Sequence, residues 1–271
     1  MTRPARPVVC MLTDYGPGTE HVGALHAVIA TACPAADRID LAHDVPRGDV
    51  RGGAVLLARL APLLPGAVHL AVVDPGVGTD RRAVAVGLRG GGALVGPDNG
   101  LLGPAARALG AEAAAVLPPP PGGAPATFHG RDLLAPAAAR LAGGAALDEL
   151  GEPADPSTLR EPDLPRAEVV DGRLRAQVIA VDRFGNLQLL AGADDLAAAG
   201  FEPGERIHAS ATDRRHPATV ARTFADVARR GLLLHLDSHG MVALAVNGGS
   251  AAARIGAGPG DTVTLGRWAR R

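Results

Sequence analysis

One stretch of the chain combines a buried-strand pattern with residue types suited to catalysis. Val68 to Val73 is aliphatic and β-branched without helical spacing, which predicts a buried strand that ends at Asp74. A Pro-Gly-Val-Gly turn follows and leads to Arg81. Ligands of open α/β sheets bind beyond the carboxyl ends of strands, so Asp74 and Arg81 are expected to share a ligand-binding loop. The alternative is a tight turn with a surface Asp–Arg pair.

Aspartates recur at the ends of predicted strands. Asp14 follows the apolar run Val8 to Leu12, and Asp98 follows Ala93 to Val95; glycines lie close behind both acids. This recurrence favours one polar site at one edge of a sheet.

A histidine stands near the start of a predicted helix. His129 precedes the helical pattern Leu133 to Leu141, and a helix N-terminus suits a polar ligand. A capping or core histidine is the alternative reading.

The elements that must position these residues alternate between strand and helix. Strands are predicted at 8–12, 38–41, 68–73, 83–88 and 93–95, with helices at 21–32, around 55–60 and at 133–141. This alternation predicts an α/β fold, in which residues 1–160 form an N-terminal, helix-flanked, largely parallel sheet domain.

A proline-rich segment with several acids separates this part from a different pattern. Gly151 to Pro165 has no apolar period, and we place the domain boundary between residues 160 and 161. Short alternating strands follow at 174–181, 187–190, 206–209, 218–224 and 232–236, with a last hairpin from 236 to 250. Residues 161–271 are therefore expected to form a smaller, mainly β domain.

Composition limits the kinds of partner. The chain has 271 residues, 47% of them hydrophobic, and 27 basic residues against 28 acidic ones. A net charge of -1 provides no field to hold nucleic acid or an anionic membrane, and aromatic residues, at 2%, offer no stacking platform for single strands. A small-molecule partner is expected, with no nucleic acid and no membrane.

The cysteines and the absence of long apolar runs bear on the cellular location of the protein. Cys10 and Cys33 are the only cysteines, which suits a reducing environment and two packing roles. No apolar run reaches the ~18 residues of a membrane span, and Met1 to Pro7 leads straight into a strand. A cytoplasmic location is expected.

Six motifs in this order resemble one family over nearly the whole chain. They are Leu12-Thr-Asp-Tyr-Gly16, Val72-Val-Asp-Pro-Gly-Val-Gly-Thr79 with Arg81, Pro97-Asp-Asn-Gly100, Phe128-His-Gly-Arg-Asp132, Phe184-Gly-Asn186, and the hairpin from Asp237-Ser238 to Asn247-Gly248. Together they resemble the S-adenosylmethionine (SAM) hydroxide adenosyltransferases, relatives of the SAM-dependent fluorinase and chlorinase.

The resemblance implies an architecture and an activity. It implies an N-terminal α/β domain, a C-terminal β-barrel-like domain, and a homotrimer whose substrate lies between the N-terminal domain of one subunit and the C-terminal domain of its neighbour. The implied reaction is attack of water on ribose C5′ of SAM, giving adenosine and methionine, with neither a cofactor nor a metal.

It also implies roles for individual residues. The catalytic triad falls on Asp74, Arg81 and His129. Substrate-binding positions fall on Asp14 at the ribose, on Asp182, Asn186 and Ser238 at the methionine, on Asn247 and Gly248 at the adenine, and on Asp98, Asn99 and Phe128 within the motifs.

The sulfonium substrate already carries a neutral leaving group, so catalysis needs an aimed water and no general acid. Asp74 would accept or orient the water proton, Arg81 would keep Asp74 ionised, and His129 would complete the water's hydrogen bonds or relay its proton. Acceptors on Asp74 and His129 would disfavour a halide. The sequence departs from the family at two places, Gly18-Thr-Glu20-His21 and the polyproline loop at 118–125. The resemblance therefore does not predict which residues form the rim of the pocket.

Three alternatives stay open. The first is halogenation on the same fold, but by resemblance the fluorinase has Tyr-Ser in place of His129-Gly130 and both halogenases lack the acid at Asp74. The second is metal-dependent phosphohydrolysis, with five ligands from strand ends: Asp14, His43, Asp74, Asp98 and His129. The third is a nucleoside sensor without turnover.

Overall fold

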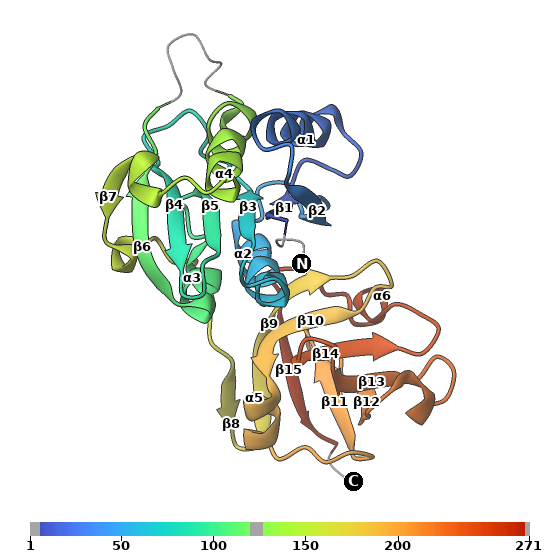
Figure 1. Cartoon of the computed structure of the whole chain (residues 1–271). Coiled ribbons are helices and arrows are strands. Elements are labelled where there is room, and N and C mark those ends of the chain that lie inside the picture. The colour runs from blue at the N-terminus through green and yellow to red at the C-terminus, as the bar shows by residue number, and fades with distance from the viewer. Residues whose placement is uncertain (1–5, 120–126, 269–271) are drawn as a thin grey trace, which may run out of the picture. The chain divides into compact units, whose positions relative to one another are not determined.

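A computed structural model describes residues 6–119 and 127–268 of the chain. The chain divides into two compact units, Met1–Asp163 and Leu164–Arg271, which are described in turn (Figure 1). The polyproline loop expected at the pocket rim lies largely outside the described residues.

The first unit is built on a seven-stranded sheet in the order β2-β1-β3-β5-β4-β6-β7. Its strands are β1 (Val8–Thr13), β2 (Asp37–Ala42), β3 (Val68–Val72), β4 (Ala83–Leu88), β5 (Ala93–Pro97), β6 (Ala111–Val116) and β7 (Glu152–Ala154). The neighbours β2, β1, β3 and β5 are parallel, whereas β4 pairs antiparallel with β5 and β6, and β7 pairs antiparallel with β6. Strands β1, β3 and β5 therefore present their carboxyl ends at one edge.

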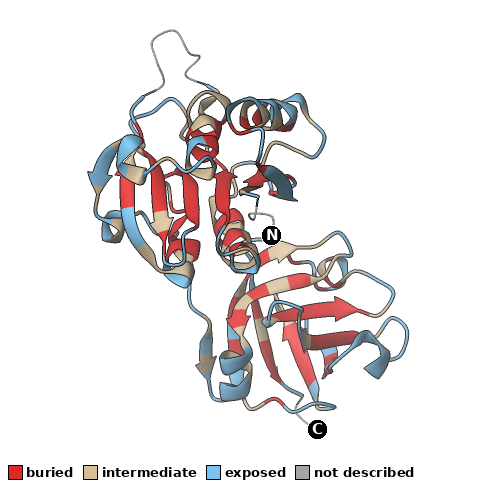
Figure 2. Cartoon of the chain, in the orientation of Figure 1, coloured by how far each residue is buried: buried red, intermediate tan, exposed pale blue. Residues whose placement is uncertain are grey.

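Helices cover both faces of this sheet (Figure 1). The helices are α1 (Glu20–Ala32), α2 (Val50–Leu60), α3 (Gly103–Leu109) and α4 (Ala135–Ala142), with short helical turns η1 (Ala61–Leu63), η2 (Gly130–Leu134), η3 (Leu147–Glu149) and η4 (Pro156–Thr158). Val9 and Met11 of β1 pack with α1 and α4, while Leu12 packs with α2 and α3, because successive side chains of a strand point to opposite faces. Because helices lie on both faces, the central strands of the sheet are buried, as Figure 2 shows. The predicted helix-flanked sheet is confirmed.

The helix predicted at 133–141 begins earlier than expected. A π-helical turn, η2, occupies Gly130–Leu134, and Ala135 donates its N–H to the carbonyl of Gly130. Pro136 has no N–H to donate to the preceding turn, so an uninterrupted α-helix through this point would lack one hydrogen bond. The wider turn places His129 directly at the helix entrance.

The second unit is a closed β-barrel. Seven strands close it in the order β10-β14-β13-β12-β11-β15-β9, with β9 pairing back to β10 and β8 added outside β9. Their bounds are β8 (Glu168–Val170), β9 (Arg173–Val181), β10 (Leu187–Gly192), β11 (Arg206–Ser210), β12 (His216–Val220), β13 (Leu232–Leu236), β14 (Met241–Val246) and β15 (Thr262–Arg267), accompanied by α5 (Ala193–Ala198), η5 (Phe224–Asp226) and α6 (Ala251–Ile255).

Closure removes the sheet edges and encloses one apolar core, as Figure 2 shows by the buried barrel strands. The strand predicted at 218–224 is too long at its end. It stops at Val220 because the carboxylate of Asp226 accepts from the N–H groups of Arg222 and Thr223, which bends the chain into η5.

Two further expectations concern the whole chain. Cys10 and Cys33 are both buried and unpaired, as packing residues would be. Within residues 6–119 and 127–268, no helix is long and apolar enough to cross a membrane.

Candidate active site

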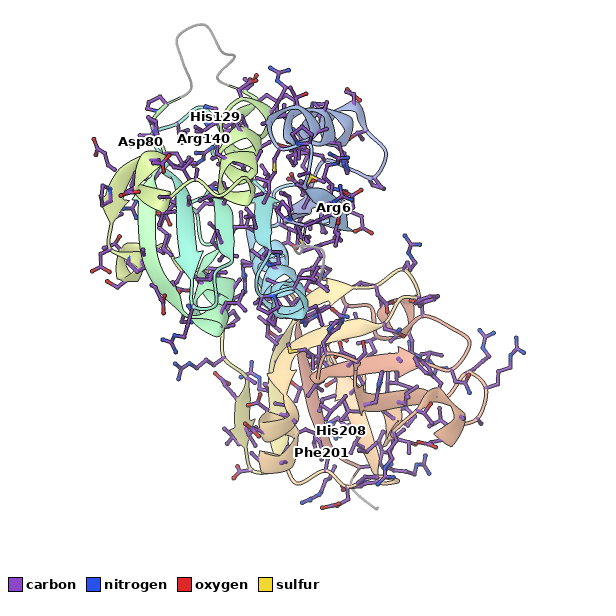
Figure 3. All side chains as sticks on the ribbon, in the orientation of Figure 1. Arg6, Asp80, His129, Arg140, Phe201 and His208 are labelled. Carbon is purple, nitrogen blue, oxygen red and sulfur yellow. The ribbon has the colours of Figure 1, made fainter. Side chains whose placement is uncertain are left out.

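Asp74, Arg81 and His129 form one contiguous hydrogen-bonded group. Arg81 Nε donates to both carboxylate oxygens of Asp74, at 2.9 and 3.0 Å, and Arg81 Nη2 also contacts Oδ2. The same Nη2 lies 3.0 Å from His129 Nδ1. The side chains of Asp74 and Arg81 are each only 6% exposed, so this ion pair is shielded from solvent. In Figure 3, His129 and Asp80, the chain neighbour of Arg81, lie at the same end of the sheet.

Arginine determines the tautomer of His129. A guanidinium has only donors, so His129 Nδ1 must accept and the proton of the neutral ring sits on Nε2. Burial lowers the pKa of His129, and the charge of Arg81 lowers it further, while Asp74 and Asp132 act in the opposite direction. His129 is thus a neutral ring that donates through Nε2. With this tautomer His129 presents a donor, and not the expected acceptor, beyond its contact with Arg81, and the carboxylate of Asp74 is the acceptor of the group.

The loop that carries Asp74 is held by its own turns and by a neighbouring strand. Val77 N donates to the carbonyl of Asp74 at 3.3 Å, and Thr79 Oγ1 donates to the carbonyl of Gly76 at 2.7 Å. Asn99 Nδ2 donates to the carbonyl of Val73 at 2.9 Å. Asn99, predicted to bind substrate, therefore braces the backbone next to Asp74 in this structure.

Asp14 lies at the end of β1, beside the Asp74 loop. Its Oδ2 accepts from the N–H of Gly48 at 2.8 Å. Gly48 has a φ of +72°, and a Cβ built there would lie 3.8 Å from the ring of Pro75, so the loop after β2 runs close to the residue that follows Asp74. The loops that carry Asp14 and Asp74 thus adjoin one another, as the recurrence predicted for these two acids, whereas the third acid, Asp98, is bound by other residues.

A small ring cluster borders this group. Tyr15 lies 5.6 Å from His21 and 5.8 Å from Phe128, and His21 lies 5.1 Å from Phe128, measured between ring centroids. Burial raises the pKa of Tyr15, and the charges of Asp14 and Asp74 raise it further. Of these three residues the sequence predicts only Phe128 as a site residue. Tyr15 belongs to the motif Leu12–Gly16, and His21 to the segment Gly18–His21 that departs from the family.

Asp98 is engaged elsewhere. It is 3% exposed, its Oδ2 accepts from Arg82 Nε at 2.9 Å and from Arg82 Nη2 at 2.5 Å, and its Oδ1 accepts from the N–H of Arg160 at 2.8 Å. Arg82 Nη2 also donates to the carbonyl of Thr158. These bonds tie β5 to the segment that follows η4, and they do not favour a direct ligand contact by Asp98.

The barrel carries the remaining predicted residues. Asp182 Oδ1 accepts from the N–H of Asn186 at 2.9 Å, and Asp182 Oδ2 accepts from Asn186 Nδ2 at 2.8 Å. Asn247 Nδ2 donates to the carbonyl of Val227 at 2.9 Å. The next residue, Gly248, has a φ of +73°. The predicted Asp–Asn pair is thus a preformed turn.

A pocket of about 570 Å³ lies in the barrel unit. Its lining residues are Phe184, Asn186, Phe224, Val246, Gly248, Gly249 and Ser250. Two of the predicted residues, Asn186 and Gly248, are among them, whereas Ser238 lies in the exposed turn between β13 and β14 and is not. Phe184 is 73% exposed, so an aromatic face is open at this pocket.

The five ligands of the phosphohydrolase alternative are not grouped. Asp74 and His129 are bonded to Arg81, and Asp98 to Arg82. Among the described residues, the one group of three or more potential cation ligands within reach of one another is His26, Asp40 and His43, which shares only His43 with that set.

The motifs that build this geometry match one family along both units. The family description "SAM hydroxide adenosyltransferase N-terminal domain" matches residues 9–151, and "SAM hydroxide adenosyltransferase C-terminal domain" matches residues 176–264. The chain belongs to this family. Fluorinases are also related, at 26–29% identity.

Individual relatives cover nearly the whole chain. The (R)-S-adenosyl-L-methionine hydrolase of Salinispora tropica is 49% identical over 263 residues, covering 96% of this chain and 97% of the relative. The (R)-S-adenosyl-L-methionine hydrolase of Thermus thermophilus is 41% identical and covers 96% and 99%. The solved structure of an uncharacterized conserved protein from Thermotoga maritima superposes with a TM-score of 0.89 at 31% identity, covering 96% of this chain and all of that one.

Proposed function

We propose that the protein hydrolyses S-adenosyl-L-methionine, with water attacking ribose C5′ and methionine leaving, to give adenosine. The observation that carries this proposal is the hydrogen-bonded Asp74–Arg81–His129 group, with its shielded Asp74–Arg81 ion pair, which occurs in a chain 49% identical to an (R)-S-adenosyl-L-methionine hydrolase. From that relative we also take the epimer at sulfur to be R.

In the proposed reaction the three side chains have different roles. Asp74 accepts a hydrogen bond from the water and receives its proton as the oxygen bonds to C5′. His129 Nε2–H donates to the water oxygen and fixes its direction. Arg81 holds both groups through one guanidinium and offsets the charge of Asp74. The C–S bond breaks with its electron pair on sulfur, which leaves as a neutral thioether, so one proton is released overall.

Further residues of both units are proposed to bind the substrate. Asp14 and Phe128 bind the ribose side, Asp182, Asn186 and Ser238 bind the methionine, and the backbone at Asn247 and Gly248 faces the adenine. Asp98 and Asn99 act chiefly by holding β5 and the Asp74 loop in place, as their hydrogen bonds suggest. The substrate is a cation, and Asp14 and Asp74 provide the carboxylates that attract it.

We also propose a homotrimer in which the N-terminal unit of one protomer and the C-terminal unit of a neighbour complete each site. The support is that the triad and the barrel pocket belong to different units of the chain, which the family resemblance assigns to one substrate.

The product profile tests the function. Purified protein is mixed with the R and S epimers of S-adenosyl-L-methionine, separately, and products are identified by mass spectrometry. Adenosine and methionine from the R epimer support the proposal. Turnover of neither epimer, or a 5′-halo nucleoside formed with added chloride or fluoride, would contradict it.

A further inference from the structure

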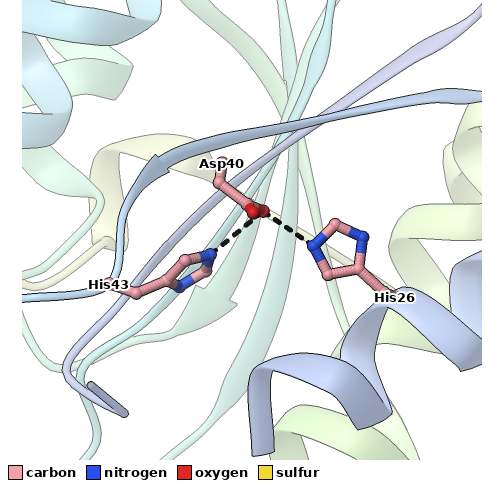
Figure 4. A group of neighbouring side chains, drawn as sticks. All are labelled: His26, Asp40 and His43. Carbon is pink, nitrogen blue, oxygen red and sulfur yellow. Dashed lines mark hydrogen bonds and ion pairs between the residues drawn. The ribbon is translucent and has the colours of Figure 1, made fainter. Parts of the chain in front are cut away.

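Two histidines and one aspartate converge at a place that the proposed reaction does not use. His26 lies on α1, Asp40 on β2, and His43 directly after β2 (Figure 4). His26 Nε2 lies 2.9 Å and His43 Nε2 3.0 Å from the same oxygen, Asp40 Oδ1. One ligand atom from each residue lies within 4.8 Å of the other two.

A hydrogen bond at Nδ1 fixes the orientation of the His43 ring. Its side chain is 5% exposed, and its Nδ1 is hydrogen-bonded to Thr13 Oγ1 at 2.8 Å. Its Nε2 faces the Asp40 carboxylate and has no other partner in the described parts of the chain. A buried ring nitrogen therefore points into the cluster, next to a carboxylate that could share a cation with it.

The donor set has the chemistry of a transition-metal site. Two imidazole nitrogens and one carboxylate oxygen suit Zn²⁺ and similar borderline cations, and metal-bound histidines commonly bond their second nitrogen to a protein oxygen, as His43 does with Thr13. Donors about 2.1 Å from one cation lie within about 4.2 Å of each other, so small side-chain rotations suffice.

We propose that His26, Asp40 and His43 bind a divalent cation of the zinc class. The side chains of His26 and Asp40 are 33% and 45% exposed, so the cation can enter from solvent and keep water as a further ligand. None of the three residues belongs to the proposed catalytic or substrate-binding set, and the proposal stands apart from the hydrolytic reaction.

Such a cation would connect α1, β2 and the loop after β2, next to the loop that carries Asp14. It would link α1 to β2 and to His43, whose carbonyl accepts from the N–H of Gly16 at 2.8 Å. His43 thus contacts the residue before Asp14 through its ring and the second residue after Asp14 through its backbone. Binding would stabilise this loop and raise the melting temperature.

Calorimetry on the full chain tests the proposal. Chelator-treated protein is titrated with ZnCl₂, and we expect one zinc per chain. His26→Gln and Asp40→Asn keep polar side chains at partly exposed positions and should each weaken binding at least tenfold, by about 1.4 kcal/mol or more. His239→Gln, at an exposed histidine of the barrel unit, is the matched control and should bind as the parent does.

Cobalt provides a second readout. Co²⁺ bound by these ligands should produce visible d–d absorption bands, and His26→Gln should remove them. If the parent takes up no zinc at one per chain, or if His26→Gln and Asp40→Asn both bind as tightly as the parent, the cluster is a hydrogen-bonded His–Asp–His group only and the proposal is wrong.

Discussion

At the scale of single residues, the site depends on Arg81. Its guanidinium satisfies the carboxylate of Asp74 with Nε and reaches His129 with Nη2, so one side chain sets the charge of the first and the tautomer of the second. Because one guanidinium contacts both partners, and its ion pair with Asp74 is shielded from solvent, each member of the group should have its own measurable effect on turnover.

Asp74→Asn should lower turnover and leave binding largely intact. The amide keeps the shape of the carboxylate but can neither take a proton nor carry the charge, and loss of a general base typically costs about 10²- to 10⁴-fold in rate. Single-turnover rates and calorimetric affinities for the same variant separate the two effects. A variant that turns over normally but binds poorly would move Asp74 out of the catalytic role.

Asp14→Asn should behave in the opposite way. The amide oxygen of the substituted side chain can still accept from Gly48 N, so the loop is kept, but a charged acceptor for the ribose hydroxyls is lost. Hydrogen bonds to charged groups contribute about 1.5–3 kcal/mol, so affinity should fall roughly 10- to 150-fold with a smaller effect on single-turnover rate. Unchanged affinity would remove the ribose role.

His129 should titrate below its ordinary value of about 6.5, because burial and Arg81 disfavour the imidazolium more than Asp74 and Asp132 favour it. The unfolded chain then binds the proton more readily. The contribution of His129 to stability is therefore complete above pH ~6.5 and is lost as pH falls through the lower folded pKa.

An NMR titration of the His129 ring checks this prediction. The fall in turnover at low pH should follow the same pKa that the NMR titration gives for His129. A His129 that titrates above 6.5 in the folded protein would show that the ring is not held neutral by Arg81.

At the scale of elements, close packing around the helix entrance constrains the site. A Cβ added to Gly130 would lie 2.3 Å from the Tyr15 hydroxyl oxygen, which is too close for either group to stay in place. Tyr15 therefore packs directly against the π-helical turn that follows His129, and glycine at 130 is required by this close approach.

Gly130→Ala should displace Tyr15 and destabilise the protein by about 1–3 kcal/mol, as overpacking does, with a loss of activity. Gly23→Ala is the matched control, because that helical glycine is exposed and its added Cβ would meet nothing within 4 Å. The control should gain about 0.5–1 kcal/mol. Thermal melts of both variants decide: equal stability of Gly130→Ala and the parent would contradict the packing described.

Elements with a strong apolar period, such as β1, β3 and α1, were predicted from the sequence. Others, among them α3, β6 and β15, were not predicted; α3 and β6 consist largely of alanine, which gives only a weak apolar period. The acids after β1, β3 and β5 could also be found, since turn residues follow each of them. The different role of Asp98 could not, because only the folded chain shows that Arg82 and Arg160 use both its oxygens. The ring cluster of Tyr15, His21 and Phe128 joins residues from distant segments, and the tautomer of His129 depends on a contact with Arg81 across 48 positions.

At the scale of the whole molecule, the proposed site needs groups from both units of the chain. In the proposed homotrimer an isolated protomer cannot complete the site, so activity should depend on assembly. Light scattering coupled to size-exclusion chromatography, with activity measured across the peak, should find activity at the trimer mass. A stable monomer with full activity would remove the intersubunit site.

The source of the new oxygen tests the central claim most directly. Protein and S-adenosyl-L-methionine are mixed in ¹⁸O-labelled water, with chloride or fluoride added in parallel, and the nucleoside product is examined by mass spectrometry. The account predicts adenosine with the label at the 5′ oxygen, no 5′-halo nucleoside, and a corresponding loss of labelled adenosine in Asp74→Asn. Unlabelled adenosine, or a halo-nucleoside as a major product, would contradict hydrolysis by the Asp74–Arg81–His129 group.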